Sequence, residues 1–468
     1  MKKILSAVFL TAMMLLNTVS VFADDIYVEE ESLTPPDLKA ESAMLLDLKT
    51  GRVIYSKNPD EKVYPASTTK ILTGIMALEN GNLQDTVTAS VAALAPITNE
   101  DSHMGILIDE VLTLEQLING MLVYSANDAA NVIATHLGGT TDQFVEMMNQ
   151  KAEEIGVTNT NFTNAYGIHD ENHYTTAADI ALIAQYAMQN EQFREIVKKS
   201  SYTIPATNKN EERVLPATNL FLGTARSFKY QNDRITGIKT GFTSAAGYCL
   251  VSSAVEGDTE LMAVIMKAPN QETCYTNTND LLDFGFDNYK YQPIVKAGEI
   301  ITDSKVIEAK EDKRVAFTVE SDISALLPSE ADFSEEIETV TDIPENLRAP
   351  IKKGDAIGTV SYNYKGTLIG HASLIATNDV ERNIPLYIFN MIMSILTFPF
   401  FYIPAILLII FFIIMRIHSR KQDQIKRKRR LHEKQSDRIM RDGTKTPINP
   451  KYADTTNKRN PNSRYRRK

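Results

Sequence analysis

Pro65-Ala66-Ser67-Thr68-Thr69-Lys70 is the most informative stretch of this chain, because it places a hydroxyl and an amine three residues apart at the start of an apolar helical segment. On a helix, positions three apart are surface neighbours, about 5 to 6 Å apart between their Cβ atoms. A serine nucleophile at this place has its base one turn away. The apolar residues that follow, Ile71, Leu72 and Ile75, would keep Lys70 in a low dielectric, where the neutral amine is favoured.

Two further polar motifs follow in order along the chain. Ser125-Ala126-Asn127 comes after an apolar helical segment, and its hydroxyl and carboxamide can relay a proton and hydrogen-bond a substrate amide. Lys239-Thr240-Gly241 ends a predicted edge strand, where Lys239 offers a cation and Gly241 lets a substrate backbone lie close. The three motifs together supply the groups that acyl transfer through a serine requires.

Each motif has an ordinary structural explanation when it is taken alone. A helix-capping serine beside a surface lysine, or a capping Ser and Asn, needs no catalysis. Two other stretches of the chain resemble the second and third motifs, and their positions give them an ordinary structural explanation. Lys49-Thr50-Gly51 lies in a predicted hairpin turn, so Lys49 is interpreted as a solvated loop lysine, and Ser361-Tyr362-Asn363 lies on a predicted strand far downstream. The order and spacing of the three retained motifs make their joint signal strong.

The pattern of apolar residues predicts an α/β domain over residues 39–288. Strands are expected on both sides of Gly51 and between residues 235 and 266, with helices between residues 67 and 190. The sheet should therefore pair its first and last strands, and a final amphipathic helix is expected over residues 279–286. Residues 289–380 hold short alternating segments that predict a small all-β domain.

The two ends of the chain predict export and membrane attachment. Residues 1–23 read as a cleaved signal peptide and residues 24–38 as an acidic leader. A second apolar run over residues 384–415 predicts a membrane anchor, with residues 398–415 as its core span. The basic residues that follow place this end in the cytoplasm by the positive-inside rule, so the folded domains should be extracytoplasmic.

Charge is distributed unevenly along the 468 residues. Residues 416–468 carry 19 Lys and Arg against 5 Asp and Glu, whereas the rest of the chain carries 30 against 54. The basic tail is polar and is expected to be disordered, touching anionic lipid and not nucleic acid.

Neither a metal site nor a cofactor is predicted. Cys249 and Cys274 are the only cysteines, and they are interpreted as free thiols because their number and spacing do not suggest a disulfide scaffold. The histidines show no metal-binding spacing, and His169-Asp170 lacks the Gly-x-Ser-x-Gly context of a Ser-His-Asp hydrolase.

The motifs, with Ala349-Pro350-Ile351 downstream, resemble those of the serine D-alanyl-D-alanine carboxypeptidases, which are low-molecular-mass penicillin-binding proteins. The resemblance covers about residues 39–380. It implies a five-stranded antiparallel sheet flanked by helices, of the β-lactamase/transpeptidase type, followed by a β-rich domain. It also implies removal of the terminal D-alanine from peptidoglycan stem pentapeptides and covalent inhibition by β-lactams.

The same resemblance assigns roles to individual residues. Ser67 would be the acylated nucleophile and Lys70 its base, with Ser125 and Lys239 as proton-relay and electrostatic partners. The substrate-binding residues would be Asn127, Lys239, Thr240, Gly241 and Phe242. The oxyanion hole would be formed by the backbone N–H groups of Ser67 and Phe242.

One departure from the family pattern concerns substrate recognition. Cys274 occupies the position where the family commonly has an arginine that binds the substrate carboxylate. A membrane-anchored β-lactamase, a transpeptidase and a β-lactam sensor therefore stay open as alternatives at this point.

Overall fold

The computed structural model describes residues 33–311, 313–329, 333, 336–397 and 399–441. The expected signal peptide and most of the expected leader lie outside the described residues. The chain divides into two compact units. The first contains the chain up to Ile307 together with Asp312–Val380, and the second contains Glu308–Glu311 and the chain from Glu381 onward.

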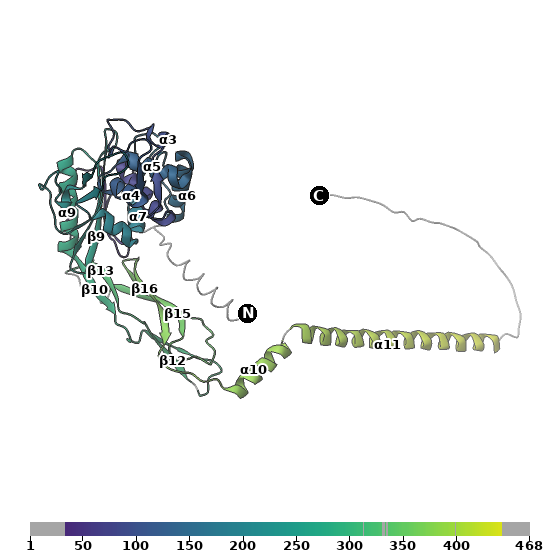
Figure 1. Ribbon diagram of the computed structural model, residues 1–468. Coiled ribbons are helices and arrows are strands. Elements are labelled where there is room, and N and C mark those ends of the chain that lie inside the picture. The colour runs from purple at the N-terminus through teal and green to yellow at the C-terminus, as the bar shows by residue number, and fades with distance from the viewer. Residues whose placement is uncertain (1–32, 312, 330–332, 334–335, 398, 442–468) are drawn as a thin grey trace, which may run out of the picture. The chain divides into compact units, whose positions relative to one another are not determined.

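The centre of the first unit is an antiparallel five-stranded sheet, of which β9 is labelled in Figure 1, and its strand order is β2-β1-β9-β8-β7. Its strands are β1 (Ser42–Asp47), β2 (Val53–Lys57), β7 (Ile235–Thr243), β8 (Gly247–Glu256) and β9 (Thr259–Ala268). The first strand pairs with the last, with Met44 opposite Val264, as the sequence predicted. The hairpin of β1 and β2 turns at Gly51, whose φ of +80° suits a glycine.

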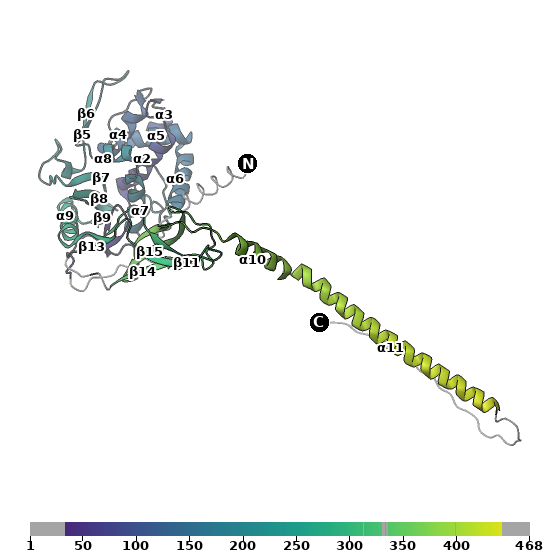
Figure 2. The ribbon, with the colours of Figure 1, turned by 90° about the horizontal axis from the view of Figure 1, so that it is seen from below.

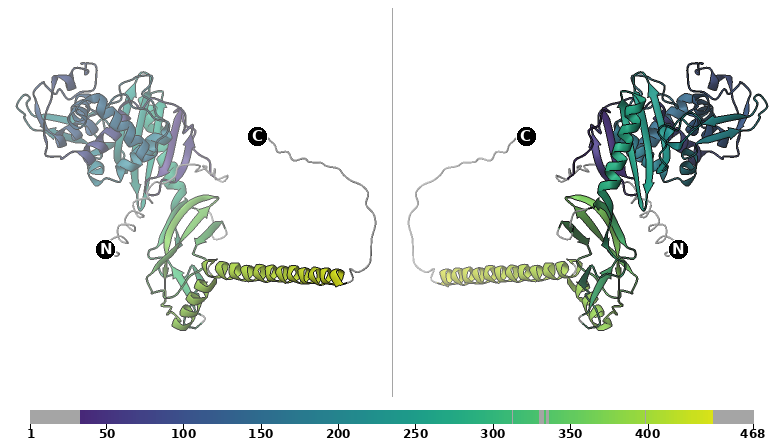
Figure 3. Two further views of the ribbon diagram at one scale, coloured as in Figure 1. Left: turned by 90° about the vertical axis from the view of Figure 1, so that its right-hand side faces the viewer. Right: turned by 90° about the vertical axis from the view of Figure 1, so that its left-hand side faces the viewer.

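Helices cover both faces of this sheet, and alternate residues of each strand explain why. Met44 and Leu46 belong to one buried cluster, whereas Ala43 and Leu45 belong to the other. All six residues of β1 are buried, which is the pattern of a strand covered on both faces. The second cluster is closed by α9 (Gln271–Asn288), which lies along one face of the sheet (Figure 3).

The opposite face is covered by a helical layer. Its elements are η1 (Ala66–Thr69), α2 (Lys70–Asn80), α3 (Val91–Leu94), α4 (Leu114–Val123), α5 (Asn127–Gly138), α6 (Thr141–Ile155), α7 (Ala177–Met188) and α8 (Glu191–Val197). Fully buried α2 residues such as Ile71, Leu72 and Ile75 place this helix in the middle of the layer. The η1 residues, which precede α2, are thereby held against the sheet. This contact fixes the position of the candidate site.

Two small hairpins and a short helix complete the domain. One hairpin pairs β3 (Thr86–Thr88) with β4 (Val111–Thr113), and the other pairs β5 (Ser201–Ile204) with β6 (Arg213–Pro216). The β5–β6 hairpin extends from the edge of the domain (Figure 2), and η2 (Leu220–Leu222) follows it. The sequence predicted neither hairpin.

A second antiparallel sheet, of order β11-β12-β16-β15-β14, confirms the predicted all-β region. Its strands are β11 (Thr302–Lys305), β12 (Arg314–Thr318), β14 (Ile337–Asp342), β15 (Ala356–Tyr364) and β16 (Thr367–Ala376). A separate ladder joins β10 (Tyr289–Val295) to β13 (Ile323–Pro328). The division proposed at residue 288 stays a prediction, although α9 ends at Asn288 and β10 begins at Tyr289.

Two differences from the sequence prediction concern helices. The helix expected over residues 279–286 begins earlier, at Gln271, where the Asn270 side chain accepts the Thr273 N–H and caps it. The disorder expected from residue 416 is not found for residues 416–441, which continue α11 (Pro399–Arg441). Lys, Arg and Gln are good helix formers, and extending an existing helix avoids the cost of nucleation.

In the second unit, α10 (Ile384–Thr397) precedes α11, whose apolar part lies within the predicted anchor. A segment of α11 from Tyr402 to Ser436 is long and apolar enough to cross a membrane, with a mean hydropathy of 2.1 in its most apolar window. Glu308 joins this unit, since its carboxylate accepts a hydrogen bond from Asn390.

Candidate active site

The nucleophile motif lies where η1 meets α2, and its backbone is locally strained. Ala66, just before Ser67, has a φ of +48°, a conformation that costs a non-glycine residue about 1 kcal/mol or more. The backbone of Gly167 is packed against it, because a Cβ built on Gly167 would lie 1.8 Å from the Ala66 carbonyl oxygen. A glycine is therefore required at position 167 for the nucleophile turn to form.

Lys70 is fully buried and touches three oxygen atoms. Its Nζ lies 2.8 Å from Ser67 Oγ, 2.7 Å from Asn127 Oδ1 and 2.7 Å from the Tyr166 carbonyl oxygen. The two carbonyl oxygens can only accept hydrogen bonds, whereas the serine hydroxyl can also donate. A neutral amine has two N–H groups, which can donate to the two carbonyl oxygens, and one lone pair, which can accept the hydroxyl proton of Ser67.

Electrostatics favour the same neutral state. Burial lowers the pKa of Lys70 well below its ordinary value, and the positive charge of Lys239 lowers it further. Asp101 and Asp128 act in the opposite direction on this pKa and do not overcome the cost of burial. The structure thus holds beside Ser67 an amine that is able to accept a proton.

Ser125 and Lys239 form a second buried pair on the other side of the site. Lys239 Nζ, which is 1% exposed, donates to Ser125 Oγ at 2.9 Å and to its neighbour's carbonyl at Thr240 O at 3.0 Å. Burial, followed by the charge of Arg226, lowers the pKa of Lys239 to about 7. Ser125 itself has a φ of +70°, so strained backbone occurs at both serine motifs.

Gly241 brings β7 against the nucleophile turn. A Cβ at this position would meet Pro65 O at 3.0 Å and Ser67 N at 3.2 Å, so the close approach depends on the absence of a side chain. Thr240 on the same strand donates to Thr218 Oγ1 at 2.8 Å. The third motif is therefore adjacent to the first.

A cavity of about 750 Å³ opens over these groups. Five of the predicted site residues line it: Ser67, Ser125, Thr240, Gly241 and Phe242. The side chain of Phe242 is exposed and packs on the ring of Tyr248. Lys70, Asn127 and Lys239 lie beneath this lining and contact its serines or each other, so the structure brings together all eight residues that the sequence singled out.

Asn127 is oriented toward the protein. Its Oδ1 accepts from Lys70, its Nδ2 lies 3.4 Å from Asp101 Oδ1, and its backbone N–H donates to Ser102 O at 2.7 Å. These contacts fix the position of Lys70. The substrate contact expected of Asn127 stays a prediction.

Several residues of the site were not found from the sequence. Glu100, Ser102, Thr218, Arg226 and Tyr275 line the cavity, and Tyr166 contacts Lys70 only through its carbonyl oxygen. A backbone acceptor leaves no mark in side-chain identity, but Gly167 beside it was a signal of an unusual turn. Cys274 lines the cavity as well, buried beside Tyr275.

Both cysteines are free, as the sequence predicted. Burial raises the pKa of Cys249 to about 11 and that of Cys274 well above its ordinary value, so both are neutral thiols. A neutral thiol at position 274 supplies no charge for binding an anion. The two set-aside motifs also lie where expected, with Lys49 exposed in the β1–β2 turn and Ser361 on β15.

Two parts of the chain match models of known protein families. Residues 29–270 match the family model described as D-alanyl-D-alanine carboxypeptidase, and residues 289–382 match the C-terminal domain of penicillin-binding protein 5. The D-alanyl-D-alanine carboxypeptidase DacF of Bacillus subtilis is 29% identical over 389 residues, which cover 82% of this chain and 95% of that protein.

A sequence match and a structure match from Haemophilus influenzae are comparable. The D-alanyl-D-alanine carboxypeptidase DacA is 29% identical over 389 residues, covering 81% of this chain and 94% of its own length. The crystal structure of penicillin-binding protein 5 superposes with a TM-score of 0.62 at 31% identity, covering 75% of this chain and 100% of that chain.

Proposed function

The chain belongs to the D-alanyl-D-alanine carboxypeptidase family of serine peptidases. We propose that Ser67 is the nucleophile and that it becomes acylated by the substrate. Its activity is that of a serine carboxypeptidase acting on peptidoglycan. The β-lactamase, transpeptidase and sensor alternatives are not favoured by its relatives. The observation that carries the assignment of Ser67 is the set of three contacts made by Lys70 Nζ.

In the acylation step, Ser67 Oγ attacks the carbonyl carbon of the penultimate D-alanine while its proton passes to the neutral Lys70. The carbonyl oxygen becomes an oxyanion, and we propose the backbone N–H groups of Ser67 and Phe242 as the donors that stabilise it. A donor of this kind contributes about 3 to 4 kcal/mol to catalysis. The closeness of Gly241 to Ser67 N supports this pairing of η1 with β7.

The C–N bond then breaks, and the departing amine of D-alanine takes a proton. Ser125, hydrogen-bonded to Lys239, is the relay on the leaving-group side of the cavity. The remaining serine ester is hydrolysed by water, with Lys70 again accepting a proton. A β-lactam ring presents a similar carbonyl to Ser67, and we expect it to form the same kind of ester.

Carboxylate recognition is assigned to a different set of residues from the one the family pattern predicts. The thiol of Cys274 is neutral, and two cations, Lys229 and Arg226, line the cavity; we assign the role to Arg226, whose charge also lowers the pKa of Lys239. Its Nε donates to Pro216 O at 3.3 Å, and its guanidinium lies 4.7 Å from the centre of the Tyr124 ring. We propose that Arg226, together with Thr240 and Thr218 of the same lining, binds the terminal carboxylate of D-alanine.

The enzyme is proposed to act at the outer surface of the cell membrane. The apolar segment of α11 would be a single-pass anchor, and the basic residues after it would keep the C-terminal tail in the cytoplasm. This topology places the catalytic domain next to the cell wall. We further propose peptidoglycan stem pentapeptides as its substrate and β-lactams as covalent inhibitors.

The test combines covalent labelling with product release. Wild-type protein should be labelled by a fluorescent penicillin and should release D-alanine from a peptide ending in Lys-D-Ala-D-Ala. Ser67→Ala should lose both activities while keeping its melting temperature. Labelling that persists in Ser67→Ala would show that another residue is the nucleophile, and adducts that turn over in less than a second would point to a β-lactamase instead.

A further inference from the structure

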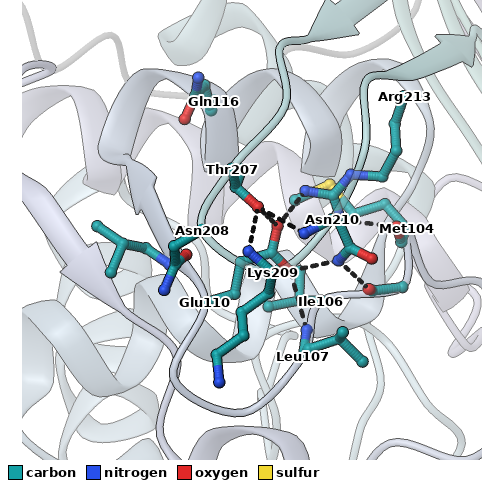
Figure 4. Close-up of polar contacts among 12 residues, drawn as sticks. Met104, Ile106, Leu107, Glu110, Gln116, Thr207, Asn208, Lys209, Asn210 and Arg213 are labelled. Carbon is teal, nitrogen blue, oxygen red and sulfur yellow. Dashed lines mark hydrogen bonds and ion pairs between the residues drawn. The ribbon is translucent and has the colours of Figure 1, made fainter.

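Outside the catalytic groups, a buried hydrogen-bond network is centred on the carboxylate of Glu110, whose side chain is 0% exposed (Figure 4). Four donors surround it. Leu107 N donates at 2.9 Å, Thr207 Oγ1 at 2.8 Å, Asn210 Nδ2 at 2.6 Å and the Arg213 guanidinium at 2.5 Å. Three of these donors come from the β5–β6 hairpin, about a hundred residues along the chain, so Glu110 joins two distant segments.

The first of these segments is one wall of the active-site cavity, which we call the first wall (residues 98–110). Glu100 and Ser102 of this wall line the cavity, and Ser102 O accepts the backbone N–H of Asn127. The hairpin holds its backbone directly, because Arg213 donates to Met104 O at 3.1 Å and Asn210 to Gly105 O at 3.0 Å. The first wall is therefore held by the hairpin through its carbonyl groups and by Asp128 of α5, whose carboxylate accepts the N–H groups of Met104 and Ile106.

The second segment leads into another part of the cavity lining, the second wall (residues 216–227). Arg213 begins β6, and the chain leaves β6 at Pro216, whose carbonyl accepts a hydrogen bond from Arg226. Thr218 of the same wall bonds to Thr240 of β7. The pair of Glu110 and Arg213 thus connects two segments that each contribute residues to the lining of the cavity.

A buried ion pair of this kind contributes little to the free energy of folding. Removing two charges from water costs several kcal/mol, and the attraction between them often only balances that cost. Arg213 Nε, moreover, is buried without a hydrogen-bond partner among the described residues. What such a network does provide is a fixed geometry, because Oε1 accepts from Thr207 and Arg213 of the hairpin, while Oε2 accepts from both segments, through Leu107 N and Asn210 Nδ2.

We propose that Glu110 and Arg213 form a brace that sets the separation of the two walls, and with it the fit of the peptide substrate. This inference rests on the proposed carboxypeptidase function. Both residues are positioning residues, since neither lines the cavity. The brace predicts an effect on substrate affinity that is distinct from its effect on folding.

The main test is Glu110→Gln, which keeps the shape of the side chain, removes the charge that pairs with Arg213, and leaves one oxygen that can accept two of the four hydrogen bonds. We expect KM for a Lys-D-Ala-D-Ala pentapeptide to rise about tenfold while kcat changes less than about threefold, because small displacements of substrate-positioning groups weaken binding strongly. Thr207→Val is a milder second variant that removes one donor to Glu110, and it should raise KM by an intermediate factor. It keeps the test decisive if Glu110→Gln does not fold.

A matched control is available in the same domain. Glu260 of β9 accepts two hydrogen bonds from Arg194 of α8, and neither residue lines the cavity. Glu260→Gln should lower the melting temperature while leaving KM unchanged. Equal KM in wild type, Glu110→Gln and Thr207→Val would overturn the brace, as would a KM rise of the same size in Glu260→Gln.

The wild-type measurement separates this proposal from the proposed function. A wild-type protein that releases no D-alanine contradicts the proposed function itself. Normal release by wild type together with normal KM in the brace variants contradicts only the brace.

Discussion

The tripeptide Lys-Thr-Gly occurs twice in this chain, at residues 49–51 and 239–241, and the two copies lie in opposite environments. In the β1–β2 turn, Lys49 is exposed and donates to Asp258 O at 2.6 Å. On β7, Lys239 is buried, bonds to Ser125, and has its pKa lowered to about 7. The comparison teaches that burial and neighbours, and not the tripeptide, give the lysine its chemical role.

The largest expected difference between the two copies is in catalysis. Lys239→Gln should reduce the rate of acylation by penicillin on the order of 10³-fold, since a relay and electrostatic partner is lost. Lys49→Gln should leave that rate unchanged, because its side chain lies in an exposed turn. Both rates are measured by stopped-flow labelling at matched folded concentration. Comparable losses in the two variants would contradict the assignment of Lys239.

The same substitution should also move the pH dependence of the remaining activity. Lys70 accepts a proton only when it is neutral, so acylation rises as pH rises through the pKa of Lys70. Burial lowers this pKa first, and the charge of Lys239 lowers it further. Lys239→Gln removes the second cause, so the pKa of Lys70 rises and the ascending limb shifts to higher pH. A pH profile of the residual labelling rate, with Lys49→Gln as control, checks the direction.

Arg226 contributes to the difference between the two lysines, because its charge lowers the pKa of Lys239. Arg226→Gln should raise KM for a peptide ending in a free D-alanine carboxylate by roughly tenfold to a hundredfold, the range for a charge-assisted hydrogen bond. The same peptide with an amidated terminus offers no carboxylate, so its KM should be equal in wild type and variant. A loss of the same size for both peptides would show that Arg226 does not bind the carboxylate.

Gly241 provides a fourth test, and its counterpart in the other copy is Gly51. A Cβ on Gly241 would press on Pro65 O and Ser67 N, which must then move by a few tenths of an ångström. Gly241→Ala should therefore slow acylation about tenfold by displacing one proposed oxyanion donor. Burst amplitude with fluorescent penicillin separates this slower reaction from loss of folded protein.

Much of this site could be predicted from the sequence because its catalytic groups are side chains in short motifs. Ser67, Lys70, Ser125 and Lys239 were found in this way, and the alternation of Met44 and Leu46 with Ala43 and Leu45 is typical of a strand covered on both faces. The pairing of the first and last strands followed from strands at both ends of the domain.

The parts that could not be predicted depend on tertiary contacts. Lys70 contacts the backbone carbonyl of Tyr166, and every residue has such a carbonyl, so the sequence gives no sign of this contact. The role proposed for Glu110 depends on its contacts with a hairpin about a hundred residues away. The β3–β4 and β5–β6 hairpins have strands of three or four residues, too short for a clear pattern of alternation. The helical stretch after Met415 continues an apolar helix and has little apolar pattern of its own.

The smallest expected effect belongs to Gly51 and concerns stability alone. Its φ of +80° is a conformation that costs an alanine roughly 1 kcal/mol, so Gly51→Ala should lower the free energy of unfolding by about this amount. The position lies in the exposed turn with Lys49, so the acylation rate should equal that of wild type. Urea unfolding and penicillin labelling on the same preparations measure the two quantities. A slower acylation in Gly51→Ala would mean that the first Lys-Thr-Gly influences the site after all, and the contrast between the two copies would fail.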